Sequence, residues 1–227
     1  MSSPEARAAL RALTEEITSC RKCPRLVEWR EAVARAPRAA FSGQTYWGRP
    51  VPGLGDPRAA VLFAGLAPAA HGGNRTGRVF TGDRSGDWLF AALWRAGLAN
   101  QAESVSLTDG MRLTGAYVAA AVRCAPPANK PTTEERDSCL PYLRRELEIL
   151  DGVRVVVALG RFAHDACAGL LGIRPRPAFG HASEVRAEDG RYLLGSYHPS
   201  QQNTFTGKLT VAMLDSVVLR AKELAGL

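Results

Sequence analysis

The chain has 227 residues, 46% of them hydrophobic, so it can bury a normal core and wholesale disorder is excluded. Lysine and arginine total 29 against 22 aspartate and glutamate residues, a formal net charge of +7 that is compatible with a polyanionic partner. No apolar stretch approaches the roughly 20 residues that span a bilayer, and the N-terminus lacks a signal-peptide core. We therefore expect one α/β domain over residues 1–227, a cytoplasmic location and no membrane partner.

The first quarter of the chain is predicted to be helical and then irregular. Leu10, Leu13 and Ile17 recur at helical spacing within residues 3–18, and a second helix is expected at about 26–36. Residues 37–56 are rich in glycine, proline and aromatic residues, which is typical of a long ordered loop.

Four apolar runs then alternate with helical segments. The runs, at 59–64, 116–122, 153–159 and 191–196, predict buried strands, and helices are expected at about 87–96, 133–150, 161–171 and 208–225. Thr132 and Glu135 form a capping box for the second of these helices, which Pro141 is expected to kink or divide. The alternation predicts a central, mainly parallel four-stranded sheet flanked by helices, with ligands bound beyond the carboxyl ends of its strands.

Four cysteines have the spacing of a metal site. Cys20 and Cys23 form a close pair, and Cys124 and Cys139 follow a hundred residues later. Thiolates are ligands of iron–sulfur clusters and of structural zinc, and reduced thiols in the cytoplasm favour metal binding over disulfides. Such a centre would tie the N-terminal segment to the middle of the chain. Cys167 lies in a helical pattern and is expected to be a buried apolar residue.

Two loops resemble motifs of a known enzyme superfamily. Gly65-Leu66-Ala67-Pro68 and His198-Pro199-Ser200 resemble the first and second motifs of the uracil-DNA glycosylases, and the four cysteines resemble the iron–sulfur branches, families 4 and 5. Residues 71–83 are similar to family 5, and Leu66 stands where family 4 carries glutamate. The resemblance covers about residues 20–207 and favours family 5.

The resemblance implies a uracil-DNA glycosylase-like fold and a monofunctional DNA repair enzyme. Such an enzyme would flip uracil, and other deaminated bases, out of DNA and hydrolyse the base–sugar bond, leaving an abasic site. It also implies a [4Fe–4S] cluster on Cys20, Cys23, Cys124 and Cys139, with zinc as the alternative for four cysteines, and we expect a monomer. Because Leu66 cannot handle water, a noncatalytic iron–sulfur nucleic-acid-binding protein remains an alternative, and an electron-transfer protein is a third.

Three residues receive catalytic roles from the resemblance. His198 is expected to be a neutral imidazole that donates to a base oxygen as negative charge develops there. Asp83 is the nearest replacement for the polar group missing at Leu66, and would handle water or stabilise the sugar cation. Asn129 would hold water or the base. The alternatives are a structural histidine, a helix cap and ordinary turn chemistry, respectively.

The remaining site residues are predicted to bind the base and the DNA. Phe80 lies fourteen positions after Leu66, the offset of the aromatic residue on which the flipped base stacks in family 4, although a core phenylalanine is the alternative. Ala120 stands where relatives with narrow uracil selectivity place asparagine, so we expect tolerance of several deaminated bases. The predicted base-binding set is Gly65, Leu66, Ala67, Phe80, Ala120, Asn129 and His198. The predicted DNA-binding set is Arg75, Ser200, Gln201, Gln202, Asn203, Phe205 and Lys208, with Phe205 as a wedge.

Overall fold

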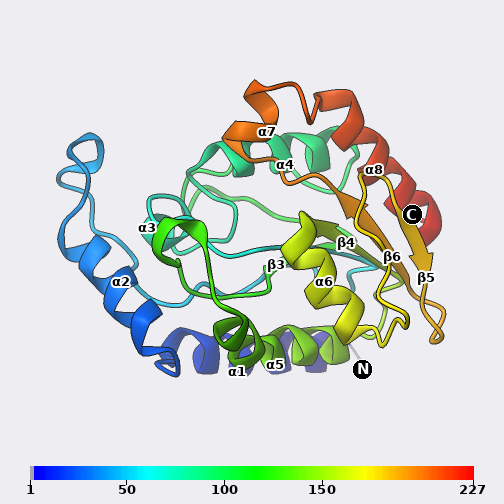
Figure 1. Cartoon of the computed structure of the whole chain (residues 1–227), viewed down its shortest axis with the longest axis horizontal. Coiled ribbons are helices and arrows are strands. Elements are labelled where there is room, and N and C mark those ends of the chain that lie inside the picture. Colours follow the sequence, from blue (N-terminus) through cyan, green and yellow to red (C-terminus); the bar gives the residue numbers. More distant parts are fainter. Residues whose placement is uncertain (1–2) are drawn as a thin grey trace.

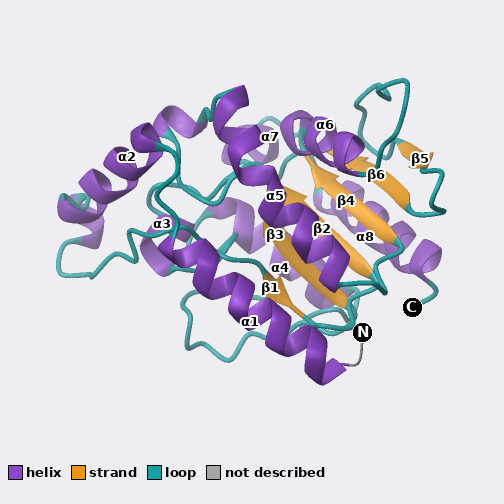
Figure 2. Ribbon diagram, turned by 90° about the horizontal axis from the view of Figure 1, so that it is seen from below, coloured by secondary structure: helices purple, strands orange, loops and turns teal. Residues whose placement is uncertain are grey.

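The computed structural model describes residues 3–227, which are built around one six-stranded sheet in the order β1-β3-β2-β4-β6-β5. Figure 2 shows the strands side by side in this order. The four central strands, β2 (Val61–Gly65), β3 (Ala116–Ala120), β4 (Val155–Leu159) and β6 (Tyr192–Ser196), are parallel. The edge strands β1 (Leu54–Gly55) and β5 (Glu184–Arg186) pair antiparallel.

Helices cover both faces of the sheet, because alternate side chains of each buried strand point to opposite sides. Val61 and Phe63 pack into one core with helices α4 (Arg84–Arg95) and α8 (Val211–Ala225). Leu62 and Ala64 pack into the other core with α5 (Thr133–Ile149) and α6 (Arg161–Leu170). Figure 1 shows these layers, with α4 and α8 above the sheet and α5 below it.

The N-terminal helices lie against the α5 side and then lead away from it. Helix α1 (Ser3–Ser19) runs along α5, and its Leu13 and Ile17 are buried beside Cys139. Helix α2 (Pro24–Arg35) begins directly after Cys23 and contacts the short helix α3 (Gly73–Thr76). A 3-10 turn, η1 (Ala39–Phe41), follows. The chain that leaves the first cysteine pair therefore reaches the loop after β2.

The predicted mainly parallel sheet flanked by helices is confirmed, but four strands were too few. The missed strands β1 and β5 have two and three residues, too short to show a periodic pattern. Short helices α3, η2 (Pro127–Asn129) and α7 (Gln201–Phe205) occupy segments for which no helix was predicted. Helix α5 continues through Pro141 and is not divided.

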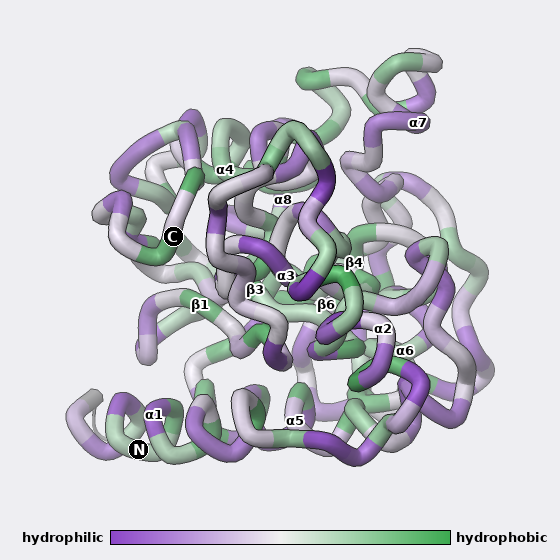
Figure 3. The backbone as a smooth tube through the Cα atoms, turned by 90° about the vertical axis from the view of Figure 1, so that its left-hand side faces the viewer, coloured by the Kyte–Doolittle hydropathy of each residue, from purple (hydrophilic) through white to green (hydrophobic). Residues whose placement is uncertain are grey.

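The surface and the interior follow hydropathy as expected. In Figure 3 the strands run through a centre coloured mainly green and white, whereas the segment around α7 stands at the rim of the molecule. In the part of the chain from residue 3 to residue 227, every helix is too short or too polar to cross a bilayer.

Candidate active site and cysteine site

A cavity of about 640 Å³ opens beyond the carboxyl ends of β2 and β6. It is formed by the loop after β2, the residues that precede α4, the 3-10 turn after β3 and the segment after β6. Nine of the predicted site residues line it: Leu66, Ala67, Phe80, Asp83, Asn129, His198, Ser200, Gln201 and Gln202. The other predicted base-binding and DNA-binding residues lie outside this lining. A concavity of about 650 Å³ lies at the opposite, amino-terminal ends of β4 and β6, away from every predicted site residue.

His198 projects from the segment that follows β6, is partly buried and lines the cavity. Burial lowers the pKa of His198 to about 4, so the ring is neutral at pH 7. Asn203 donates its amide to the His198 carbonyl at 2.8 Å. The backbone of Gly160 packs closely against the His198 side chain, because a Cβ at residue 160 would lie only 3.2 Å from the Cβ of His198. A neutral, fixed imidazole is the form that can donate one proton to an acceptor in the cavity.

Asp83 is the N-cap of α4 and also faces the cavity. Its Oδ1 accepts hydrogen bonds from the backbone N–H groups of Ser85 and Gly86, at 2.9 and 3.1 Å. The capping alternative is therefore seen in the structure. Oδ2 makes no hydrogen bond to the described residues, and a Cβ at Gly72 would come within 2.1 Å of it. Burial raises the pKa of Asp83 in spite of the two backbone donors. One oxygen holds the helix, and the other is free for water.

Phe80 is partly a core residue and partly a wall of the cavity. It is 8% exposed, belongs to the core on the α4 side, and its ring stacks on the His198 ring with centroids 5.9 Å apart. A Cβ at Gly65 would lie 2.5 Å from the Phe80 ring, so only glycine fits there. Phe80 has a φ of 51°, which is rare for a residue with a side chain.

Ala120 is the last residue of β3 and Asn129 lies beyond that strand, and the two residues occupy different environments. Ala120 ends β3 opposite Gly65, is 2% exposed and packs in the same core as Phe80, so this position offers no polar group to a base. Asn129 is exposed on the wall of the cavity and has a φ of 56° in the turn η2. Its N–H donates to Pro126 at 3.2 Å, which is the turn chemistry considered as its alternative.

The segment predicted to enter the duplex forms the exposed helix α7. Ser200 caps this helix by accepting a hydrogen bond from Asn203 N. Phe205 is 66% exposed, and the guanidinium of Arg84 lies over its ring at 5.2 Å. Arg84 lines the cavity and was missed by the sequence analysis, although a basic residue directly after Asp83 was a visible signal. An exposed aromatic ring beside a cation at the mouth of a cavity suits a nucleic-acid contact.

Two predicted DNA-binding residues are directed inward instead. Arg75 donates to the carbonyls of His71 and Gly82, at 2.7 and 3.0 Å, so its guanidinium holds the loop that carries Phe80. Asn203 is committed to His198. Lys208, by contrast, is exposed, and its ammonium lies 4.9 Å from the Tyr197 ring centroid.

The four spaced cysteines meet around one small cavity. The cavity lies between the segment that leads into α2, the segment after β3, and α5. Its lining includes the four cysteines together with Arg30, Arg123 and Tyr142; the cysteines are Cys20, Cys23, Cys124 and Cys139. All are free thiols, and burial raises the pKa of Cys124 to about 11 and of Cys139 to about 12. Within residues 3–227, no three side chains of the ligand type close around a single ion.

A buried cation beside these thiols was not foreseen. Arg30 is 2% exposed and donates to Cys124 Sγ at 2.9 Å and to the Cys20 carbonyl at 3.2 Å. Arg21, which lies between the first two cysteines, pairs with Glu31 at the surface. Arg30 lies on the buried face of α2 with Leu26 and Val27, seven residues after Cys23, and this spacing was its only signal. A buried guanidinium against sulfur fits a site that carries negative charge.

Known proteins place this chain in one family. The family model for the uracil DNA glycosylase superfamily matches residues 52–222. A type-5 uracil-DNA glycosylase from Mycobacterium tuberculosis is 55% identical over 93% of this chain and 80% of its own length. A type-5 enzyme from Thermus thermophilus is 52% identical over 95% of this chain and 98% of its own length. A type-4 enzyme from Pyrobaculum aerophilum is 32% identical over 73% of this chain. The chain therefore belongs to the uracil-DNA glycosylase superfamily, with the type-5 rather than the type-4 members.

Proposed function

We propose that this protein is a monofunctional uracil-DNA glycosylase that flips uracil from DNA and hydrolyses its N-glycosidic bond, leaving an abasic site. One observation carries the proposal: a single cavity beyond the sheet gathers a neutral imidazole, a partly free carboxylate and an aromatic ring, His198, Asp83 and Phe80. The chain's similarity to type-5 uracil-DNA glycosylases supports the same substrate.

Two cavity residues stabilise the opposite charges that develop on the base and on the sugar as the bond breaks. The neutral ring of His198 donates to the departing base oxygen, where negative charge accumulates. The free Oδ2 of Asp83 orients water toward the sugar carbon and stabilises positive charge on the sugar. Leu66 is apolar and takes no part in moving water. None of the three residues given catalytic roles carries an amine nucleophile, so strand cleavage through a Schiff base is not expected.

We further propose that the site accepts several deaminated bases besides uracil. The support is the resemblance at Ala120, which stands where relatives with narrow uracil selectivity place asparagine, so this position carries no side-chain amide to read a base edge. A cavity without that buried amide leaves fewer polar groups unpaired when another base enters, so it rejects the other base less strongly. Excision rates on duplexes that carry uracil, hypoxanthine, xanthine or thymine opposite guanine test this. Strict selectivity for uracil would contradict it.

We also propose that Cys20, Cys23, Cys124 and Cys139 hold a [4Fe–4S] cluster. When bound, the cluster would supply a covalent brace between the start of α2, the segment after β3 and α5. Two features support it: the four thiols line one cavity, and Arg30 provides a buried cation for a negatively charged group. Iron and sulfide analysis of protein purified without oxygen tests the proposal, and stoichiometric zinc would contradict it.

Free thiols around a shared site fit a reducing compartment, so we propose that the protein acts in the cytoplasm. We propose a single-domain monomer as the working unit, because one chain supplies every wall of the cavity.

The defining experiment is a gel assay on a duplex with one uracil. The protein is incubated with end-labelled DNA, and hot alkali then cleaves any abasic site. We expect a cleaved strand only after alkali. Binding of the duplex without alkali-labile sites would favour the noncatalytic alternative that Leu66 keeps open.

A further inference from the structure

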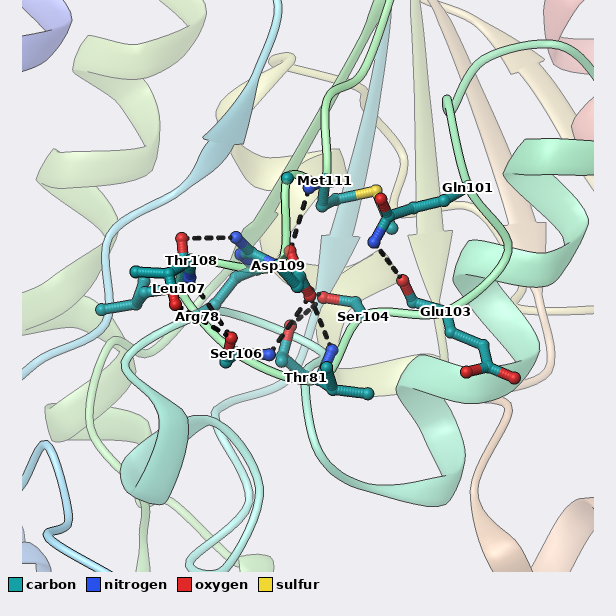
Figure 4. Close-up of polar contacts among 12 residues, drawn as sticks. Arg78, Thr81, Gln101, Glu103, Ser104, Ser106, Leu107, Thr108, Asp109 and Met111 are labelled. Atoms are coloured by element: carbon teal, nitrogen blue, oxygen red, sulfur yellow. Dashed lines mark hydrogen bonds and ion pairs between the residues drawn. The ribbon is translucent and has the colours of Figure 1, made fainter.

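Phe80 is held in an unusual backbone conformation between two buried polar residues. Its φ is 51°, and non-glycine residues stay in this region only when the surrounding structure determines it. Arg78 and Thr81, on either side of it, are 5% and 0% exposed. Both reach out of their own segment to residues 104–109, a loop that contributes nothing to the lining of the cavity. Figure 4 shows these side chains converging.

The hydrogen bonds form a chain that begins at Arg78. A guanidinium can only donate, so Arg78 Nη1 donates to Ser104 Oγ at 3.0 Å. Thr81 Oγ1 lies 2.7 Å from Ser104 Oγ, a contact in which either hydroxyl can donate, and 3.2 Å from the Val79 carbonyl. This chain of hydrogen bonds therefore leaves residues 78–81 at Arg78 and returns at Thr81 and at the Val79 carbonyl, on both sides of Phe80.

Asp109 organises the loop that receives these bonds. Its Oδ1 lies 2.6 Å from Arg78 Nη1, and both side chains are 6% exposed. It also accepts hydrogen bonds from the backbone N–H groups of Val105, Ser106 and Met111, at 2.7, 3.2 and 2.9 Å. Burial disfavours its charge, but Arg78 and these donors outweigh burial and lower the pKa of Asp109 to about 2. The loop is thus held by its own hydrogen bonds and by Arg78, and it contributes no residue to the cavity lining.

We propose that residues 104–109 are a clamp that positions Phe80 for the flipped base, with Ser104 and Asp109 as positioning residues. The proposal rests on the proposed function. The Phe80 ring stacks on the His198 ring, and Phe80 precedes Asp83 by three residues, so Phe80 links the two groups that act on opposite ends of the breaking bond. A small displacement of Phe80 would disturb the positions of both the His198 ring and the Asp83 carboxylate.

Thr81 offers a matched pair of variants. Thr81→Val keeps the shape of the side chain but removes the hydroxyl that joins Ser104 to Val79, whereas Thr81→Ser keeps the hydroxyl. We expect Thr81→Val to lower the single-turnover excision rate about tenfold without changing the affinity for undamaged duplex, and Thr81→Ser to retain the rate. Both are measured where circular dichroism shows fully folded protein. Should Thr81→Val fail to fold, Ser104→Ala removes the same link and replaces it in each comparison.

A double-mutant cycle separates positioning from general structural support. If the clamp acts through Phe80, Thr81→Val has little further effect on the excision rate once Phe80→Ala is present. The same factor in both backgrounds, or a wild-type rate for Thr81→Val, overturns the clamp. These outcomes leave excision by the wild-type protein intact, whereas a wild-type protein without any excision would defeat the proposed function instead.

Discussion

Titration of His198 is the prediction that the structure specifies most closely. Donation from His198 to the base requires a neutral imidazole at pH 7, and partial loss of solvent around the ring lowers its pKa from 6.5 to about 4. Activity in acid does not isolate this group, because Asp83, whose pKa burial raises, must also be ionised. The imidazole has to be observed directly.

The magnitude follows from the two pKa values. At about pH 6, a ring with a pKa near 4 is about 1% protonated, whereas a solvated histidine is about three-quarters protonated. The shift corresponds to roughly 3 kcal/mol of preference for the neutral ring. Because the folded pKa lies below the unfolded one, the unfolded chain binds the extra proton, and stability is lost as the pH falls from about 6.5 to about 4.

The assay is nuclear magnetic resonance of the histidine rings in ¹⁵N-labelled protein between about pH 7.5 and pH 4.5. The chain has four histidines, so comparison with His198→Gln identifies the resonance of this ring. We expect it to stay neutral throughout most of the range. A ring that titrates near 6.5 would refute the conclusion that the cavity desolvates His198.

Three other predictions concern separate parts of the molecule. Asp83→Asn keeps a good N-cap for α4 but loses the charge, so we expect the excision rate to fall by about 100-fold or more with little change in the free energy of unfolding. Asp83→Ala should also lower the free energy of unfolding by about 1 kcal/mol, because it removes the cap. Equal stability of the two variants would contradict the capping role. Arg30→Gln should lower the iron content per chain while Arg21→Gln does not, because Arg30 donates to a cysteine sulfur whereas Arg21 pairs with Glu31 at the surface. Unchanged iron in both variants would show that Arg30 does not support the cluster. Phe205→Ala should change the free energy of unfolding by less than about 0.5 kcal/mol but weaken binding to uracil-containing duplex. Arg84→Gln should reduce the slope of log binding constant against log salt concentration by about one unit. Affinities and slopes equal to wild type would place α7 away from the DNA.

The sequence was informative where a local pattern determines position. Apolar runs such as 153–159 had to be buried strands, and parallel strands deliver their following loops to one edge, so Leu66 and His198 were predicted to meet there. The cysteine spacing likewise predicted one shared site. These features depend on residue order alone.

The remainder depends on contacts between distant segments. Edge strands β1 and β5 are too short to carry a pattern, and each exists because a neighbouring strand offers unpaired backbone groups. Arg30 reads as a surface arginine until α2 is folded against Cys124. The pairing of Arg78 with Asp109 joins residues 31 positions apart and could not be deduced from either neighbourhood.

The central claim is that this cavity breaks a base–sugar bond, and one measurement tests it most directly. Wild-type protein with its iron content verified is mixed in excess with a duplex that carries a single uracil, and released uracil is quantified alongside alkali-labile sites. We expect one free base and one abasic site per duplex, and neither product from His198→Ala. Duplex that is bound by the protein yet keeps every uracil would contradict the account.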